Sequence, residues 1–77
     1  MQIYVNTVQI GDGYTLHLQF SNGKKKTFDV KPYLNRGIFR KLQDKKMFDS
    51  ARVENGTVTW NGGQDFCPDT LYSESVE

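Results

Sequence analysis

The chain has 77 residues, of which 36% are hydrophobic and 25% are charged, and its formal net charge is +1. This length predicts one domain with a small core, and the single cysteine, Cys67, excludes an internal disulfide. The chain has no apolar run of the ~20 residues that span a bilayer, and its N-terminus lacks the basic start and apolar stretch of a signal peptide, so we expect a cytoplasmic protein that does not bind membranes.

The first two strands are predicted from their side-chain patterns. Residues 3–10 are rich in β-branched side chains, and their apolar positions change parity near Asn6-Thr7, which predicts a β-bulge. Gly11-Asp12-Gly13 then predicts a tight turn. Residues 14–20 alternate apolar and polar side chains, so this strand has an apolar face and a polar face, and His17 lies on the polar one.

The third strand is predicted over residues 25–30, and the turn before it decides where Phe28 falls. A two-residue turn would pair Phe28 with His17 on the polar face, whereas a three-residue loop pairs it with Leu16 on the apolar face. We therefore predict a three-residue loop over residues 21–23, with its glycine in the left-handed conformation.

A short helix is predicted over residues 36–43, with Asn35 as its N-cap. Two helical turns are unstable alone in water, so this helix must pack on the sheet. Residues 44–50 are expected to form a second turn or a loop that Met47 and Phe48 hold against the core. The apolar stripe of the helix comprises Ile38, Phe39 and Leu42.

A second hairpin is predicted around Asn55-Gly56, which is a strong signal for a type I′ turn and pairs Val53 with Val58. Trp60, the only tryptophan, follows on the same face and is expected at the centre of the core. The glycines that come next end the strand. We expect Phe66 to pack back on the core and a single helical turn to follow, over residues 68–72.

Together these elements predict an α+β domain over residues 1–72, with three strands, a short helix and two strands in that order. The sheet is expected to be mainly antiparallel, with the helix on one face, and residues 73–77 are expected to form a frayed acidic tail. The expected core residues are Leu16, Leu18, Phe28, Phe39, Leu42, Phe48, Val58, Trp60 and Phe66.

Four landmarks occur in order: Phe28-Asp29-Val30, residues 37–44, Phe48, and the stretch 60–72 with its Trp-Asn-Gly-Gly-Gln-Asp-Phe start. With them the chain resembles the bacterial domain-of-unknown-function family 2442 over nearly its whole length. The resemblance implies a small α+β domain of unassigned biochemistry, and many members resemble one half of a toxin–antitoxin pair. Some relatives are labelled for molybdopterin-guanine dinucleotide biosynthesis, but this chain lacks a glycine-rich phosphate loop.

The charge is unevenly distributed along the chain. Residues 24–52 hold all ten basic residues and three acidic ones, a net charge of +7, and the remainder holds six acidic residues and no basic one. Folded together, the basic side chains form either a surface for a partner or for nucleic acid, or a solvated face that keeps the domain soluble. The candidate surface residues are Lys24, Lys25, Lys26, Arg40, Lys41, Lys45 and Lys46.

Few residues of this sequence could take part in catalysis or metal binding. The only histidine, His17, is predicted to face outward, away from Cys67, so a nucleophilic pair is disfavoured. One histidine and one cysteine do not make a structural zinc site. Asp65 and Asp69 are better explained as caps of a turn and of a helix. We expect no catalytic residue, no metal and no cofactor.

The favoured function is therefore a non-enzymatic module that binds another small protein or a second copy of itself. The contact surfaces would be the hairpin tip, the outer helix face and an exposed sheet edge. Nucleic-acid binding through the surface between Lys24 and Lys46 is the alternative, and a small enzyme is the third.

Overall fold

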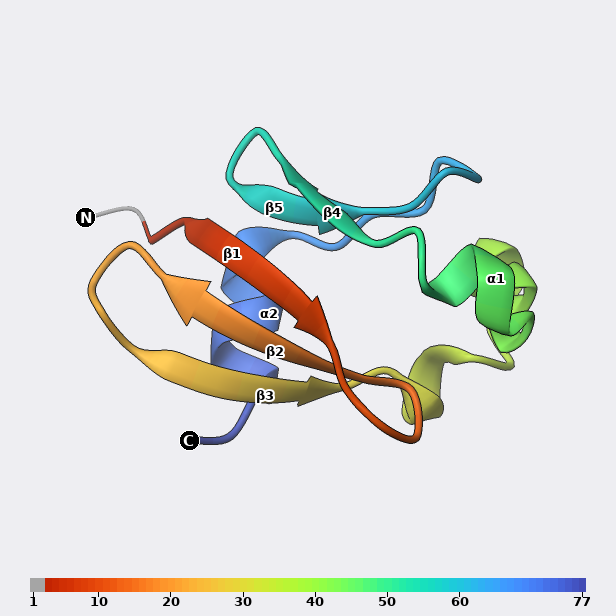
Figure 1. The fold of residues 1–77 in the computed structure, drawn as a ribbon, viewed down its shortest axis with the longest axis horizontal. Helices are drawn as coiled ribbons and strands as arrows, with labels where there is room; N and C mark the ends of the chain where they lie inside the picture. Colours follow the sequence, from red (N-terminus) through yellow and green to blue (C-terminus); the bar gives the residue numbers. More distant parts are fainter. Residues whose placement is uncertain (1–2) are drawn as a thin grey trace.

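A computed structural model describes residues 3–77 and divides the strands between two antiparallel sheets (Figure 1). The predicted antiparallel α+β class is confirmed. A backbone hydrogen bond of 2.8 Å from Val5 to Gly56 joins the start of the first strand to the turn of the second hairpin. The larger sheet holds β1 (Val5–Ile10), β2 (Thr15–Phe20) and β3 (Lys25–Asp29), and the smaller holds β4 (Arg52–Glu54) and β5 (Thr57–Thr59).

The strand registers agree with the parity arguments. The pairing of β1 with β2 shifts between Val5 and Thr7, which is the predicted β-bulge. Leu16 is paired with Phe28 across β2 and β3, so the three-residue loop is also confirmed, and its Gly23 has a φ of +87°. Val53 pairs with Val58 in the second hairpin.

The segment after β3 differs from its prediction. It forms the 3-10 helices η1 (Lys31–Tyr33) and η2 (Gly37–Gln43), followed by the single-turn helix α1 (Lys45–Phe48). Asn35 does not cap η2, whose N-cap is Arg36; the side-chain Oδ1 of Asn35 accepts a hydrogen bond from Gln43 Nε2 at 3.4 Å.

Ile38 is consequently not part of the apolar stripe, and it is 59% exposed. A 3-10 helix has three residues per turn, so residues three apart share a face. Phe39 and Leu42 therefore share one face, which packs inward, whereas Ile38 lies on another face together with Lys41. Leu42 is fully buried and Phe39 stacks on Phe66 at 4.7 Å between ring centroids.

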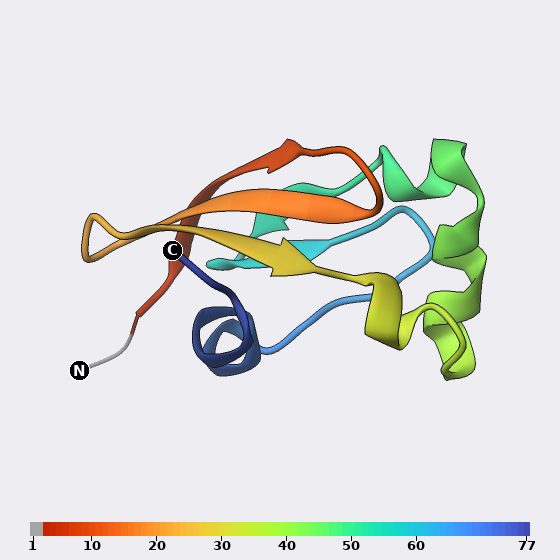
Figure 2. The same cartoon turned by 90° about the horizontal axis from the view of Figure 1, so that it is seen from below.

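The core lies between the two sheets, and η2 and α1 close one end of it (Figure 2). All the expected core residues are buried except Phe39, which is half-buried. Trp60 is 1% exposed, and its Nε1 donates a buried hydrogen bond of 3.0 Å to the Phe48 carbonyl oxygen. This bond ties the end of α1 to the centre of the core.

The C-terminal helix α2 (Pro68–Glu74) is longer than the single predicted turn and lies on the inner side of the larger sheet (Figures 1 and 2). Leu71 is fully buried, and Tyr72 contacts Phe20 edge-on at 5.0 Å between centroids. Within residues 3–77, no helix has the length and apolar character to cross a bilayer.

The acidic end of the chain is paired with β3, which contradicts the expectation that residues 73–77 fray. Val76 forms two backbone hydrogen bonds with Thr27, of 2.7 and 2.9 Å. The Glu77 carboxylate is 3.2 Å from Lys24 Nζ. The unpaired backbone groups of an edge strand explain this pairing, because they favour any segment that can hydrogen-bond to them.

Replacing Val76 with proline is expected to release this segment. Proline has no backbone N–H, so the 2.9 Å bond from Val76 to the Thr27 carbonyl oxygen is lost at a cost of about 1 kcal/mol. We expect faster hydrogen exchange at the Thr27 amide. Val76→Ala is the control, since the side chain is 68% exposed and both backbone bonds remain. Unchanged exchange in Val76→Pro would show that the pairing is not stable in solution.

Candidate functional site

The seven candidate basic residues lie at opposite ends of the molecule and do not form one surface. Lys24, Lys25 and Lys26 are at the β2–β3 hairpin end, whereas η2 and α1 carry the other four at the far end (Figures 1 and 2). The longest extent of the domain is 33 Å. Because β3 rises about 3.3 Å per residue, it carries the chain away from the hairpin before η2 begins.

The hairpin lysines have different environments. Lys24 is ion-paired with Glu77, and Lys26 Nζ donates to the Tyr72 carbonyl oxygen at 2.6 Å while lying 4.0 Å from the centre of the Tyr72 ring. Both therefore hold the C-terminal segment in place. Lys25 is exposed on the outer face of the sheet and has no ion pair within residues 3–77.

At the far end, η2, α1 and the residue before η2 carry exposed side chains that we call together the basic end. The three-residue period places Ile38 and Lys41 on one face of η2 and Arg40 on another. Lys45 is excluded because its Nζ is 3.6 Å from the Asp49 carboxylate. In the part of the chain that the structure describes, none of the four cations of the basic end has an ion pair. Its members are Arg36, Ile38, Arg40, Lys41 and Lys46.

Two hydrogen bonds hold the backbone of the basic end in position. The Asp44 side chain accepts from the Lys46 amide at 3.1 Å and caps α1. Gln64 is fully buried, and its Nε2 donates to the Ile38 carbonyl oxygen at 3.0 Å. The backbone that presents Ile38 is therefore attached directly to the turn after Trp60.

Gln64 was not among the residues singled out from the sequence. Its side chain folds back over Gly62, where an added Cβ would lie 2.6 Å from Gln64 Oε1. The signal available in the sequence was the pair of glycines directly before it, since glycine allows close approach of a side chain to the backbone. Arg36, the first residue of the predicted helix, is likewise not among the candidate surface residues from the sequence.

The polar residues weighed for catalysis or metal binding are not brought together. His17 lies on the outer face of the sheet, with Nδ1 3.2 Å from Thr27 Oγ1. Cys67 is exposed and lines a separate depression, to which Asp69 also contributes. Asp65 forms an isolated bridge with Thr59. Among residues 3–77, no group of three or more His, Cys, Asp or Glu residues is arranged to hold a metal ion.

The turn expected to be capped by Asp65 is closed by backbone groups. The Gly63 amide donates to the Trp60 carbonyl oxygen at 3.0 Å, and the Trp60 amide donates to the Gln64 carbonyl oxygen at 3.0 Å. Trp60 and Phe66, at the two sides of this turn, are both buried. The stretch that carries the strongest family resemblance is therefore structural.

Comparison with known proteins identifies the family. A family model described as "Protein of unknown function (DUF2442)" matches residues 5–77. No curated protein and no solved structure has a significant match. The family match covers nearly the whole chain, from β1 through the paired C-terminal segment, and it agrees with the landmarks in the sequence. The chain therefore belongs to the DUF2442 family of proteins of unknown function.

Proposed function

We propose that this domain is a non-enzymatic protein-binding module that docks on an acidic partner through the basic end. The observation that carries the proposal is Ile38, a large apolar side chain that is 59% exposed on the same face of η2 as Lys41, which has no ion pair in the described chain. Protein interfaces combine a buried apolar anchor with a polar rim. The charges would select an acidic partner and speed its association.

The rigidity of the basic end supports the same proposal. The bond from Gln64 to the Ile38 carbonyl oxygen and the Asp44 cap of α1 hold both supporting segments before any partner binds. Affinity improves when an interface needs little ordering, because less conformational entropy is lost on binding. The backbone that carries Ile38 is thus held by a hydrogen bond from a buried side chain.

The partner class follows from charge. Two basic ends repel each other, so a symmetric contact between two copies through this surface is disfavoured. A separate acidic protein in the cytoplasm would complement the positive charge of this surface better. The finer form of the proposal is a partner encoded beside this chain, as in a toxin–antitoxin-like pair, and this form rests on the family resemblance alone.

Nucleic-acid binding is the second candidate, and the four cations of the basic end favour it. Base stacking has little support, because the nearby rings are used internally: Tyr33 packs edge-on against Phe66 at 5.0 Å, and Phe39 stacks on Phe66. Any such binding would therefore depend on phosphate contacts and would weaken steeply with salt.

The test begins with co-purification from the native host, where we expect one small acidic protein in stoichiometric amount. That protein is identified, produced separately and titrated by calorimetry. Ile38→Ala and Lys41→Glu should each weaken binding at least tenfold, about 1.4 kcal/mol. Lys25→Glu is the matched control, since it reverses an exposed lysine at the opposite end, and it should change the affinity less than twofold.

Two results of this test would overturn the proposal. One is the absence of a stoichiometric partner across growth conditions, and the other is an equal loss of binding in Lys41→Glu and Lys25→Glu.

A second experiment tests nucleic-acid binding. A 20-nucleotide single strand and a duplex of the same length are titrated in parallel by fluorescence anisotropy at 50 and 200 mM salt. Tight binding that Lys41→Glu removes and salt weakens would assign the surface to nucleic acid instead.

A further inference from the structure

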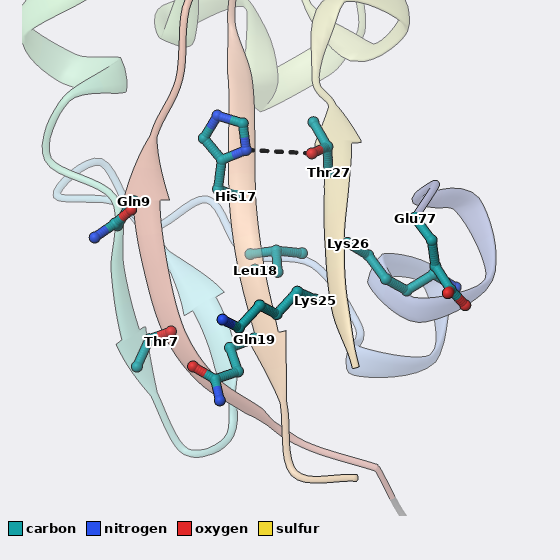
Figure 3. Close-up of a pocket in the computed structure, with 9 residues that line it drawn as sticks. All are labelled: Thr7, Gln9, His17, Leu18, Gln19, Lys25, Lys26, Thr27 and Glu77. Atoms are coloured by element: carbon teal, nitrogen blue, oxygen red, sulfur yellow. Dashed lines mark hydrogen bonds between the residues drawn. The ribbon is translucent and has the colours of Figure 1, made fainter. Parts of the chain in front are cut away.

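The outer face of the larger sheet carries a depression of about 390 Å³ (Figure 3). This volume is within the range of small-molecule sites, about 300–1,000 Å³. The alternation of the strands places their apolar side chains inward and leaves polar ones on this face. The side chains that line it from the three strands include Thr7, Gln9, His17, Gln19, Lys25 and Thr27.

The strand registers arrange these side chains in two rows. Gln9, His17 and Thr27 are paired across the sheet in one row, and the row two residues further along holds Thr7, Gln19 and Lys25. Neighbouring strands are about 4.8 Å apart and alternate residues about 6.7 Å apart, so the six side chains occupy an area of about 10 by 7 Å. That area matches a small organic molecule.

His17 forms one wall of the depression, and its ring is held in place. Nδ1 is 3.2 Å from Thr27 Oγ1, and the dashed line in Figure 3 marks this hydrogen bond. The edge of the ring lies over Gly11, where an added Cβ would be 2.6 Å from His17 Nε2. Glycine at that position is therefore required for this placement of the imidazole.

Lys25 supplies a positive charge at the depression. Figure 3 shows its side chain extending from β3 over Gln19. Within residues 3–77 it has no ion pair, whereas Lys24 on one side and Lys26 on the other are engaged by the C-terminal segment. Glu77 also borders the depression, but its carboxylate is paired with Lys24 at 3.2 Å. The ammonium group of Lys25 is thus available for an anion.

We propose that this face binds a small anion that carries several hydroxyl groups, the chemistry of a sugar phosphate. Its anionic group would lie at Lys25 and Gln19, and its hydroxyl groups would extend toward Thr27 and His17. Amide and hydroxyl side chains both donate and accept hydrogen bonds, which suits hydroxyl groups. The site is separate from the basic end and goes beyond the protein-binding function proposed for that surface.

The test is a titration of the ¹⁵N-labelled protein with glucose 6-phosphate at low ionic strength, followed by amide chemical shifts. Glucose and inorganic phosphate are titrated as its two halves. We expect saturable shifts at Gln19, Lys25 and Thr27, with tighter binding than to either half. Lys25→Gln should weaken the binding of glucose 6-phosphate at least tenfold. The matched Lys41→Gln at the other end of the molecule should leave this affinity unchanged.

A second variant separates recognition of the hydroxyl groups from recognition of the charge. Thr27→Val removes a hydroxyl group without changing the side-chain shape. It should weaken the binding of glucose 6-phosphate several-fold and leave the affinity for inorganic phosphate unchanged. The proposal is wrong if no saturable shifts occur at 10 mM ligand, or if Lys41→Gln weakens binding as much as Lys25→Gln. Equal affinities for glucose 6-phosphate and inorganic phosphate would overturn recognition of the hydroxyl groups.

Discussion

Trp60→Ala is expected to lower the free energy of unfolding by about 3–5 kcal/mol, as truncations of large core aromatics do. The indole is 1% exposed, and its ring centroid lies 5.8 Å from that of Phe66. Its loss also removes the buried bond from Nε1 to the Phe48 carbonyl oxygen. At 0.05–0.15 kcal/mol per residue, a domain of this size has a total stability of about 4–12 kcal/mol, so the substitution removes a large part of it.

The measurement is urea denaturation followed by circular dichroism, because the variant has no tryptophan fluorescence. Trp60→Phe should show a smaller loss, since it keeps an aromatic ring but not the N–H donor. Ile38→Ala is the surface control and should change stability by less than about 0.5 kcal/mol. If Trp60→Ala stays folded and loses partner binding, Trp60 belongs to a binding site and not only to the core.

Gln64→Glu is expected to cost about 3–5 kcal/mol at pH 7, because it places an unpaired carboxylate in the core. Gln64 is fully buried, its Nε2 donates to the Ile38 carbonyl oxygen, and its Oε1 has no hydrogen-bond partner among residues 3–77. An ionised carboxylate would face the Ile38 carbonyl oxygen with no donor to offer. The same substitution should therefore loosen the attachment of the basic end.

The pH dependence of Gln64→Glu gives a second readout. Burial raises the pKa of a carboxyl group, so the folded variant would bind more protons than its unfolded state. The destabilisation should begin as pH rises past about 4.3, where the unfolded carboxyl ionises, and grow up to the raised folded pKa. Lowering the pH should restore part of the loss relative to the natural protein.

The matched control is Gln64→Met, which has similar length and no charge. It should cost less than Gln64→Glu, and its effect relative to the natural protein should not change with pH. Denaturant unfolding of all three proteins at pH 4.5, 6 and 7.5 separates the two substitutions. A loss below about 1 kcal/mol for Gln64→Glu at pH 7.5 would show that water reaches the Gln64 side chain.

The features that were predicted correctly from the sequence are local ones. The bulge near Thr7 and the loop that ends at Gly23 follow from the parity of apolar side chains in a strand. The turn at Asn55-Gly56 follows from residues that accept positive φ, and these two residues have φ values of 52° and 77°. Each of these features depends on residues within one strand or one hairpin.

The candidate sites depend on contacts between residues that are far apart in the sequence. The helix over residues 36–43 was given the α period, and the 3-10 period that the structure adopts turns Ile38 outward. The C-terminal segment was expected to fray because no local signal marks its pairing with Thr27. That pairing engages Lys24 and Lys26 and leaves Lys25 over the outer face of the sheet.

The sequence by itself determined the strands, their turns and registers, and the burial of Trp60, because period-two alternation and left-handed turn residues act along the chain. Only the tertiary structure decided which charges share a surface. A hairpin separates its tip from the segment that follows it by the length of its strands, so Lys25 and Lys41 lie at opposite ends. Net charge along the sequence contains no information on that separation.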